Sequence, residues 1–444
     1  MTTSNEAKPN RRATLSWALW DWAEQPYPTI IQTFIFATYI TSSSFGDPDT
    51  ITSQLGIAGG IAGLIVALTA PVFGRRSDES GHRKRWLLVN SGLLIAIMVA
   101  SYFVAPSPSF LLFGLVLYAL GSVVQETAFI NYYAMLKQVS HEGNVGRISG
   151  FAWGLGYVGG IILLLISLVG WVLPAQAEPP TATWFNVPLT DALNYRVLFL
   201  FAAAWMLVFT IPLALFVPEV PAKLSTKRES IAASYKATIA QFARLAKTSP
   251  DTFKFLIASA IYRDGLAGVF TFGAILGTVS FGFSKTEVIF FGIAANIVAG
   301  IGAALGGYFD DRIGTKNTIV VSLVGLLIAG TSVFVLHSEG QIIYWIFGLI
   351  LCLFVGPAQA SSRTFVARFT PAGREGEVFG MYQTTGRAAS FLSPTLFALA
   401  VSAATAAGIE GASIYGIIGI VLVLLVGLVY LLRVHPRPVM AHDA

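Results

Sequence analysis

The sequence predicts an all-α polytopic membrane protein, with twelve transmembrane helices arranged as two six-helix pseudo-repeats. Three observations lead to this fold class. The chain has 444 residues, of which 55% are hydrophobic and only 11% are charged, whereas soluble domains carry about 25% charged residues. Apolar runs long enough to cross a bilayer recur along the chain, since a spanning helix needs about 20 residues. A short polar motif also occurs once in each half.

The apolar runs are separated by segments that contain charged residues. Lipid leaves no water to satisfy backbone polar groups, so each run is expected to be helical. The single cysteine, Cys352, lies within a run, so no intramolecular disulfide can form. The runs occupy approximately residues 15–41, 52–73, 86–105, 109–136, 148–172, 195–217, 253–280, 286–308, 317–337, 341–367, 377–405 and 411–433.

The distribution of charge predicts the orientation in the membrane. Lys and Arg gather before the first run, after the last run and in the even-numbered gaps, whereas Lys285 is the one basic residue of the odd-numbered gaps. The positive-inside rule then places both termini in the cytoplasm. We therefore expect a multi-pass membrane protein with its basic loops in the cytoplasm. The net charge of +5 follows from these loops and does not indicate nucleic-acid binding.

The sixth gap is the longest cytoplasmic segment and divides the chain into two halves. Within it, Ile231, Tyr235, Thr238, Phe242 and Leu245 recur at helical spacing, which predicts an amphipathic helix on the inner membrane surface. The predicted parts are a cytoplasmic tail (1–14), an N-terminal six-helix half (15–217), a cytoplasmic linker (218–252), a C-terminal six-helix half (253–433) and a second cytoplasmic tail (434–444).

The polar motif reads Gly-x3-Asp-x2-Gly-x-basic and joins the second run to the third and the eighth run to the ninth. Its two copies keep a constant offset of 233 residues. Two six-span halves related by such a repeat are typical of transporters whose substrate site lies between the halves. The candidate gating-loop residues are Gly74, Asp78, Gly81 and Arg83 in the first copy and Gly307, Asp311, Gly314 and Lys316 in the second.

Each residue type in this motif has a physical use. We expect the glycines to let the chain leave one helix and enter the next in a tight turn. The aspartate sits near helix ends, where it can accept backbone N–H groups and pair with a neighbouring base. The basic residues are expected to stay in water at the anionic inner leaflet.

The doubled motif resembles the signature of the major facilitator superfamily, and other stretches narrow the resemblance. They occupy residues 16–23, 150–157, 262–265, 362–368, 371–375, 379–380 and 390–392. Together they look like the vacuole-effluxer-like branch, whose fungal members release amino acids from the vacuole. The resemblance covers nearly the whole chain and suggests a bacterial-type member with the major facilitator fold. Together with the charge distribution it implies a protein of a bacterial cytoplasmic (inner) membrane. It implies transport of a small solute, amino acids first, and a central cavity lined by spans 1, 4, 7 and 10.

One stretch of the first span departs from this family. After the aspartate of the first span the family usually shows a small residue and then Asn-Ser, whereas Glu24, Gln25 and Pro26 follow here. The departure adds the carboxylate of Glu24 to the first span, which the resemblance places among the spans that line the cavity.

Ionisable groups inside a bilayer are costly, so those that are present are candidates for function. Polar stripes on the predicted spans must face a cavity or one another, because lipid cannot satisfy them. The candidate substrate or proton site consists of Asp21, Glu24, Gln25, Gln32, Glu126, Arg263, Asp264, Asn296, Gln359, Arg363, Gln383 and Arg387.

Three interpretations of these charges remain open. They bind a charged or zwitterionic solute, they form ion pairs that close an inner gate, or they pair for structure alone. A proton is a candidate coupling ion, and Asp21, Glu24 and Glu126 are the carboxylates that could carry it. Trp17, Trp20, Trp22 and Trp86 are expected at a membrane-surface aromatic belt.

The sequence lacks the motifs of several other classes. It contains no Gly-x4-Gly-Lys-Ser/Thr loop for nucleotide phosphates. Its five histidines are scattered, so we expect no metal centre, no cofactor and no enzymatic activity. We expect a monomer that moves a small molecule by alternating access. A sugar, drug or organic-ion permease, or a receptor or scaffold on the same fold, remains the alternative.

Overall fold

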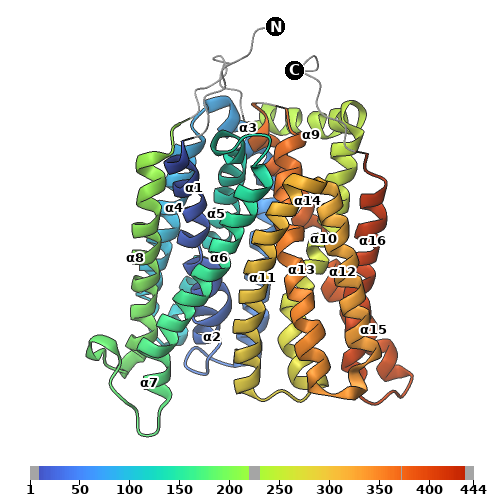
Figure 1. Ribbon diagram of the computed structural model, residues 1–444. Coiled ribbons are helices and arrows are strands. Elements are labelled where there is room, and N and C mark those ends of the chain that lie inside the picture. The colour runs from blue at the N-terminus through green and yellow to red at the C-terminus, as the bar shows by residue number, and fades with distance from the viewer. Residues whose placement is uncertain (1–9, 220–230, 372, 436–444) are drawn as a thin grey trace.

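The computed structural model describes residues 10–219, 231–371 and 373–435. Its regular elements in these ranges are all helical (Figure 1). Eleven helical segments are long and apolar enough to cross a membrane, and a further crossing at the start of the chain is divided into shorter helices. The predicted all-α membrane fold is confirmed. Residues 1–9 and 436–444 of the predicted tails, and residues 220–230 of the linker, lie outside the described residues.

The N-terminal half is a bundle in which α1 packs against α6 and α8, while α5 packs against α3 and α4. In Figure 1 it occupies the blue to green part of the chain. Its main elements are α1 (Arg11–Ala23), the π-helix η1 (Tyr27–Phe34), α2 (Phe36–Ile40), α3 (Pro48–Ser80), α4 (Arg83–Ser101), α5 (Leu111–Ala134), α6 (Val145–Ser167), α7 (Leu173–Gln176) and α8 (Leu193–Phe216).

The C-terminal half lies beside it, from yellow to red in Figure 1. Here α10 packs against α16, and α13 packs against α11 and α12. The elements are α10 (Pro250–Ile275), α11 (Lys285–Ile313), α12 (Thr315–Val335), α13 (Gln341–Phe369), α14 (Glu375–Ala389), α15 (Leu392–Ala406) and α16 (Gly416–Leu432). The helix predicted within the linker is present as α9 (Ile231–Thr248), which contacts α3 and α10.

The helix ends follow local chemistry. Asp47 caps α3 by accepting the backbone N–H of Thr50 at 2.9 Å, and Ser284 forms a capping box with Glu287 at the start of α11. Gly81 ends α3 in the left-handed region, with φ of 64°, as a C-terminal glycine does. These caps fix where two long spans begin and where one of them ends.

Two of the predicted spans are interrupted. The first apolar run breaks at Glu24 and Gln25, between α1 and η1, where prolines occupy positions 26 and 28. The eleventh run breaks at Ser390 and Phe391, between α14 and α15. A proline lacks the N–H that would continue a helix, and π-helical turns inside membrane helices often mark functional positions. The break in the first span lies at the candidate site described below.

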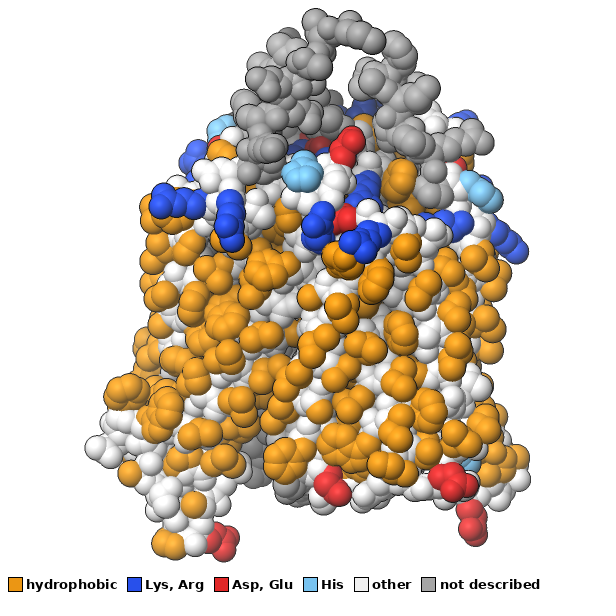
Figure 2. All heavy atoms as spheres, in the orientation of Figure 1, with side chains coloured by type: hydrophobic (Ala, Val, Ile, Leu, Met, Phe, Trp, Pro, Cys, Tyr) orange, Lys and Arg blue, Asp and Glu red, His pale blue; other side chains and the backbone are white. Residues whose placement is uncertain are grey.

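The surface of the molecule has a broad apolar belt between two polar ends. Figure 2 shows Lys and Arg side chains gathered at one end and Asp or Glu side chains at the other. The end at which α3 and α11 finish is called the basic end here, and the other is called the opposite end. The belt matches the expected lipid-facing surface, because a continuous apolar surface of this extent is unusual in a soluble protein and marks a membrane contact.

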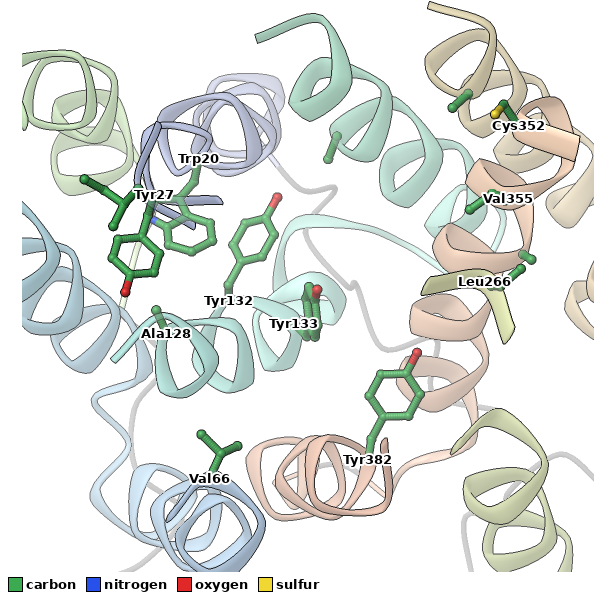
Figure 3. Close-up of a cluster of buried hydrophobic side chains, with 14 of the residues drawn as sticks. Trp20, Tyr27, Val66, Ala128, Tyr132, Tyr133, Leu266, Cys352, Val355 and Tyr382 are labelled. Atoms are coloured by element: carbon green, nitrogen blue, oxygen red, sulfur yellow. The ribbon is translucent and has the colours of Figure 1, made fainter. Parts of the chain in front are cut away.

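The buried core of the N-terminal half is rich in aromatic side chains, several of which Figure 3 shows. Trp17 and Trp20 have no exposed surface, so their predicted place in a membrane-surface belt is wrong. Trp17 stacks on Tyr132 with ring centroids 4.4 Å apart, and Trp20 lies 4.5 Å from the same ring. Both rings instead hold α1 against α5.

Candidate functional site

The two halves meet closely at the basic end and are separated by a cavity toward the opposite end. At the basic end α3 contacts α14, and α6 contacts both α11 and α13. The outer cavity has a volume of about 860 Å³, and its lining is mainly apolar and comes from both halves. It extends toward the opposite end as far as Ser42 and Ser44. The structure is therefore open on one side only.

A smaller polar pocket continues the outer cavity toward the basic end. Its volume is about 340 Å³, and it shares Gln25, Pro28 and Asn296 with the outer cavity. Six of the predicted site residues line it, namely Asp21, Glu24, Gln25, Gln32, Glu126 and Asn296. Half of the twelve predicted site residues therefore lie around the polar pocket, near the break in the first span.

Asp21 forms an ion pair with Arg363 across the junction of the two halves. The distance between the carboxylate Oδ2 and the guanidinium Nη1 is 3.1 Å. Tyr132 donates its hydroxyl hydrogen to the same carboxylate oxygen at 2.9 Å. Both charged residues are buried. Removing one partner of such a pair costs about 3–5 kcal/mol, because the other charge stays buried without compensation.

Arg363 reaches out of α13 into a pocket formed by the N-terminal half. Its Nε and Nη2 donate to the hydroxyl and the carbonyl of Ser149 at 2.9 Å and 2.6 Å. Its guanidinium carbon lies between 5.0 Å and 5.5 Å from the ring centroids of Trp17, Tyr132, Tyr133 and Trp153. Aromatic faces attract a guanidinium, so this side chain holds the two halves together at the base of the polar pocket.

A second ion pair crosses the junction beside the first. Arg387 on α14 pairs with Glu126 on α5, and the Gln383 side-chain amide donates to the other oxygen of Glu126 at 2.6 Å. Asp21 and Glu126 both line the polar pocket. Each of these carboxylates is therefore tied to an arginine of the other half.

Glu24 has a different environment from the other two carboxylates of the pocket. Its two oxygens accept hydrogen bonds from the side-chain amides of Gln25 and Gln125, both at 2.9 Å. The residue is 3% exposed. Within the described ranges no ion pair involves Glu24, so its charge is met by amide dipoles alone.

The first copy of the repeated motif also joins the two halves. Asp78 accepts the backbone N–H groups of Gly376 and Glu377, at 2.9 Å and 2.8 Å, in the first turn of α14. Arg83 pairs with Asp78 and with Glu375, at 2.7 Å from the latter. A carboxylate at a helix N-terminus satisfies unpaired donors and the helix dipole. The predicted use of this aspartate is confirmed, but the helix that it caps belongs to the other half.

The second copy makes the corresponding contact. Asp311 accepts the backbone N–H groups of Gly146 and Arg147, at 2.8 Å and 2.9 Å, in the first turn of α6. Its cation is Arg368 of α13, at 2.6 Å. Lys316, which the repeat aligns with Arg83, instead donates to the carbonyl of Leu432 at 3.1 Å.

The glycines of the motif divide into two kinds. Gly81 and Gly314 have positive φ and sit in turns, as predicted. The expectation that Gly74 and Gly307 also form turns is wrong, because both lie within helices that continue past them. A Cβ on Gly74 would lie 1.9 Å from the carbonyl oxygen of Gly376, and a Cβ on Gly307 would lie 2.4 Å from that of Gly146. These two glycines permit close helix contact between the halves.

A lysine adds a further link at the basic end. Lys137, in the segment after α5, donates to the backbone carbonyl of Thr370 in the other half. Burial lowers the pKa of Lys137, while nearby Glu375 acts in the opposite direction. The side chain is thus part of the packed junction and is not a freely solvated loop charge.

The remaining predicted residues lie away from the pocket or point to their own half. Asp264 accepts the backbone N–H of Ser393 at the start of α15, where it serves as a cap after the break in the eleventh span. Arg263 stacks on Tyr382, with its guanidinium carbon 3.8 Å from the ring centroid. Gln359 lines neither the outer cavity nor the polar pocket. Arg263 also donates to Gln383 at 3.1 Å, and Gln383 in turn donates to Glu126 of the pocket. The interruption of the eleventh span, which the apolar pattern did not reveal, explains the position of Asp264 alone.

Sequence reasoning also omitted residues that the pocket contains. Phe129, Tyr133, Trp153 and Tyr157 form its aromatic walls. The cost of burying charge in a bilayer singles out ionisable positions and does not distinguish aromatic ones. The sequence feature that indicates an aromatic wall is the pair of adjacent tyrosines at 132 and 133, on a span predicted to line the cavity.

Comparison with known proteins agrees with this architecture. The model of the family described as vacuole effluxer Atg22 like matches residues 43–437. The chain belongs to this family. An uncharacterized MFS-type transporter of Bacillus subtilis (strain 168), YxiO, is 28% identical over 396 residues, which cover 86% of this chain and 87% of that protein. Autophagy-related protein 22-1 of Aspergillus fumigatus is 24% identical over 282 residues, which cover 58% of this chain and 44% of the fungal protein.

Solved structures with little sequence similarity share the fold. The proton:xylose symporter XylE, bound to 6-bromo-6-deoxy-D-glucose, superposes with a TM-score of 0.72 at 13% identity, covering 96% of this chain and 95% of its own. A bacterial homologue of the iron transporter ferroportin, in its outward-facing state, gives a TM-score of 0.69 at 12% identity, covering 95% and 98%. The chain is an integral membrane transporter of the major facilitator superfamily, with that superfamily's helical fold.

Proposed function

We propose that this protein is a secondary active transporter of a small polar solute, with amino acids as the first class to test, and that it works by alternating access. The observation that carries the proposal is the polar pocket at the junction of the halves. It continues the outer cavity, and two of the carboxylates that line it form ion pairs with arginines of the other half. The names of the fungal relatives and the family description support an effluxer of this kind.

We propose that the basic end faces the cytoplasm of a bacterial cell and that the protein lies in its cytoplasmic membrane. The gathering of Lys and Arg at that end supports this orientation (Figure 2). The form described here is then open to the outside. Both halves of the pathway belong to one chain, which supports function as a monomer.

The ion pairs Asp21–Arg363 and Glu126–Arg387 act in this proposal as the inner gate. Each joins a side chain of one half to a side chain of the other. Opening toward the cytoplasm requires both pairs to separate, together with the caps that Asp78 and Asp311 provide. A solute that offers its own charges to these groups can lower the cost of that separation, as alternating access requires.

A ligand screen with the detergent-purified protein tests the proposal. A ligand that binds only the folded form stabilises it by RT ln(1 + [L]/Kd), about 2.7 kcal/mol at a hundredfold excess over Kd. We expect thermal stabilisation by one or more amino acids, and flux of the same compounds into liposomes that contain the protein. Stabilisation by sugars or organic anions alone would move the cargo to another class.

Arg387→Ala serves as the gate variant in the flux assay. We expect it to reach the membrane but to lose most transport, because Glu126 then lacks its cation. Arg312→Ala is the matched control, since Arg312 is exposed and its guanidinium lies over the ring of Tyr308 on its own helix. Equal flux by both variants would contradict the gate.

A further inference from the structure

Glu24 lies at the interruption of the first span. It forms the C-terminal cap of α1, at the break before η1. Discontinuous helices near the middle of a membrane commonly form the binding sites of transporters. The carboxylate of Glu24 therefore lies at the point where the helix of the first span is interrupted.

The charges around Glu24 do not cancel. The polar pocket contains the carboxylates of Asp21, Glu24 and Glu126. The guanidinium groups of Arg363 and Arg387 are bound to the first and the third of these. Among the residues that the structure describes, Glu24 has no such partner and receives only two amide hydrogen bonds. With all five groups ionised, the pocket carries one surplus negative charge.

A buried carboxylate without a fixed cation is unfavourable, so either a proton or a cation that enters from solution must neutralise it. The surroundings favour an organic cation as the second option. Phe129, Tyr133, Trp153 and Tyr157 supply aromatic rings to the same pocket, and such rings attract ammonium groups. The adjoining outer cavity is mainly apolar, which suits a hydrocarbon body attached to that group.

We propose that Glu24 binds either one proton or the ammonium group of the transported solute, and that each solute entering the pocket displaces that proton. This inference rests on the proposed transport function. The step is balanced: the carboxylic acid of Glu24 and R–NH3⁺ give the carboxylate–ammonium pair and one proton, which passes to solution through the outer cavity. Since one carboxylate cannot hold both, solute and proton move in opposite directions.

Other titratable groups face the same space. Asp21 lies on the same helix, Glu126 and Tyr133 come from α5, and Tyr157 comes from α6. Asp21 and Glu126 are held by arginines of α13 and α14. Their charges are already compensated, so exchange of a single proton is assigned to Glu24.

Proton release on binding tests the inference directly. Isoamylammonium chloride is the probe, because it carries an ammonium group and an apolar chain without a carboxylate. Leucine, with the same chain and a carboxylate, is the second probe, and isovalerate, which has no ammonium group, is the negative probe. In weakly buffered solution the full-length protein should release about one proton per bound isoamylammonium. Over the pH range in which Glu24 is protonated in the free protein, the apparent affinity for isoamylammonium should rise about tenfold per pH unit.

Glu24→Gln keeps the size of the side chain and one acceptor oxygen, and removes its charge. We expect this variant to keep its thermal stability but to lose at least most of its ammonium binding, the proton release and the pH dependence. Glu24→Asp should restore the proton release with weaker binding. Glu142→Gln, at an exposed loop glutamate, should behave as the wild type.

The outcomes separate this inference from the transport proposal. The inference is overturned if the wild type binds neither ammonium probe, or if it binds them without releasing a proton. It is also overturned if Glu24→Gln binds the probes and releases protons as the wild type does. If solute flux into liposomes continues in that case, the transport function stands. If instead both ammonium probes bind with proton release but no solute crosses the membrane, the Glu24 site stands and the transport function fails. Binding of leucine but not isoamylammonium would show that the carboxylate is also required, and would overturn recognition through the ammonium group alone.

Discussion

The two copies of the repeated motif make the same backbone contact but use different charges to support it. Asp78 caps α14, and Asp311 caps α6, in each case through two backbone N–H groups of the opposite half. Figure 1 shows the second of these pairs, α6 and α11, side by side at the front of the molecule. The capping carboxylate is thus the feature that the duplication has kept.

The cations differ between the copies. Arg83 comes from the motif itself, is largely buried, and reaches across to Glu375. In the second copy, Arg368 comes from α13 of the same half and pairs with both Asp310 and Asp311. The charge that crosses to the other half there is Arg147, whose side chain is 57% exposed. The difference indicates that the first copy depends more on buried charge than the second.

The largest expected effect is that of Asp78→Ala. The substitution removes the cap of α14 and leaves Arg83 buried with Glu375 alone, so we expect the closed basic end to lose about 3–5 kcal/mol relative to other conformations. In Asp311→Ala the loss should be smaller, because Arg368 keeps Asp310 as a partner.

Cysteine labelling measures this difference. Ser42 lines the outer cavity, so Ser42→Cys in a Cys352→Ser background should react with a membrane-impermeant maleimide while that cavity is open. Asp78→Ala should slow the reaction more than Asp311→Ala does. An equal or reversed order would show that the two copies contribute alike.

Steric contact between the halves gives the next largest effect. Gly74→Ala places a methyl group against the carbonyl of Gly376, and overpacking of this kind costs about 1–3 kcal/mol. We expect slower labelling at Ser42→Cys and reduced flux. Gly307→Ala should act similarly, because its methyl group would press against the backbone carbonyl of Gly146 in the other half.

Gly92→Ala is the matched control for both substitutions, since Gly92 is a helical glycine with open space around its Cβ position. If Gly74→Ala and Gly92→Ala behaved alike, close helix contact at the basic end would not limit the conformational change.

Glu375→Gln tests the charge that crosses between the halves in the first copy. The amide oxygen can still accept the backbone N–H of Gly373, which now lies 2.8 Å from the carboxylate, whereas the ion pair with Arg83 is lost. We expect a loss of about 1 kcal/mol, in the range of an ordinary hydrogen bond, because Arg83 keeps Asp78 as a partner. Ser42→Cys labelling at low and high salt measures it, and an effect that disappears at high salt would speak against a buried pair.

The sequence predicted the spans because lipid imposes one requirement on all of them, a long apolar run with satisfied backbone groups. The end of α16 at Leu432 and the start of α13 at Gln341 lie within a residue of the predicted limits. The partners in the ion pairs could not be predicted in this way. Asp21 and Arg363 are 342 residues apart in the chain, and several carboxylates and arginines on neighbouring spans satisfy the same apolar pattern.

The interruptions of the first and eleventh spans mark a second limit of sequence reasoning. Pro26 and Pro28 indicated a weak point in the first span, yet hydropathy alone treats the stretch as continuous. The break brings Glu24 and Gln25 to the pocket. The corresponding break between α14 and α15 takes Asp264 away from it, because that carboxylate becomes a cap. Which polar residues reach a site therefore depends on where helices end, and that depends on tertiary contacts.

The smallest expected effect is that of Arg147→Ala in the second copy. Its side chain is mostly exposed, and exposed ion pairs contribute about 0–1 kcal/mol. The backbone N–H of residue 147 can still donate to Asp311, so the cap of α6 survives. We expect Ser42→Cys labelling and flux within about twofold of the wild type, from the same small energy. A loss comparable with that of Glu375→Gln would mean that the side chain of Arg147, and not the capped backbone, joins the halves in this copy. The contrast between buried and exposed charge would then no longer explain how the two copies differ.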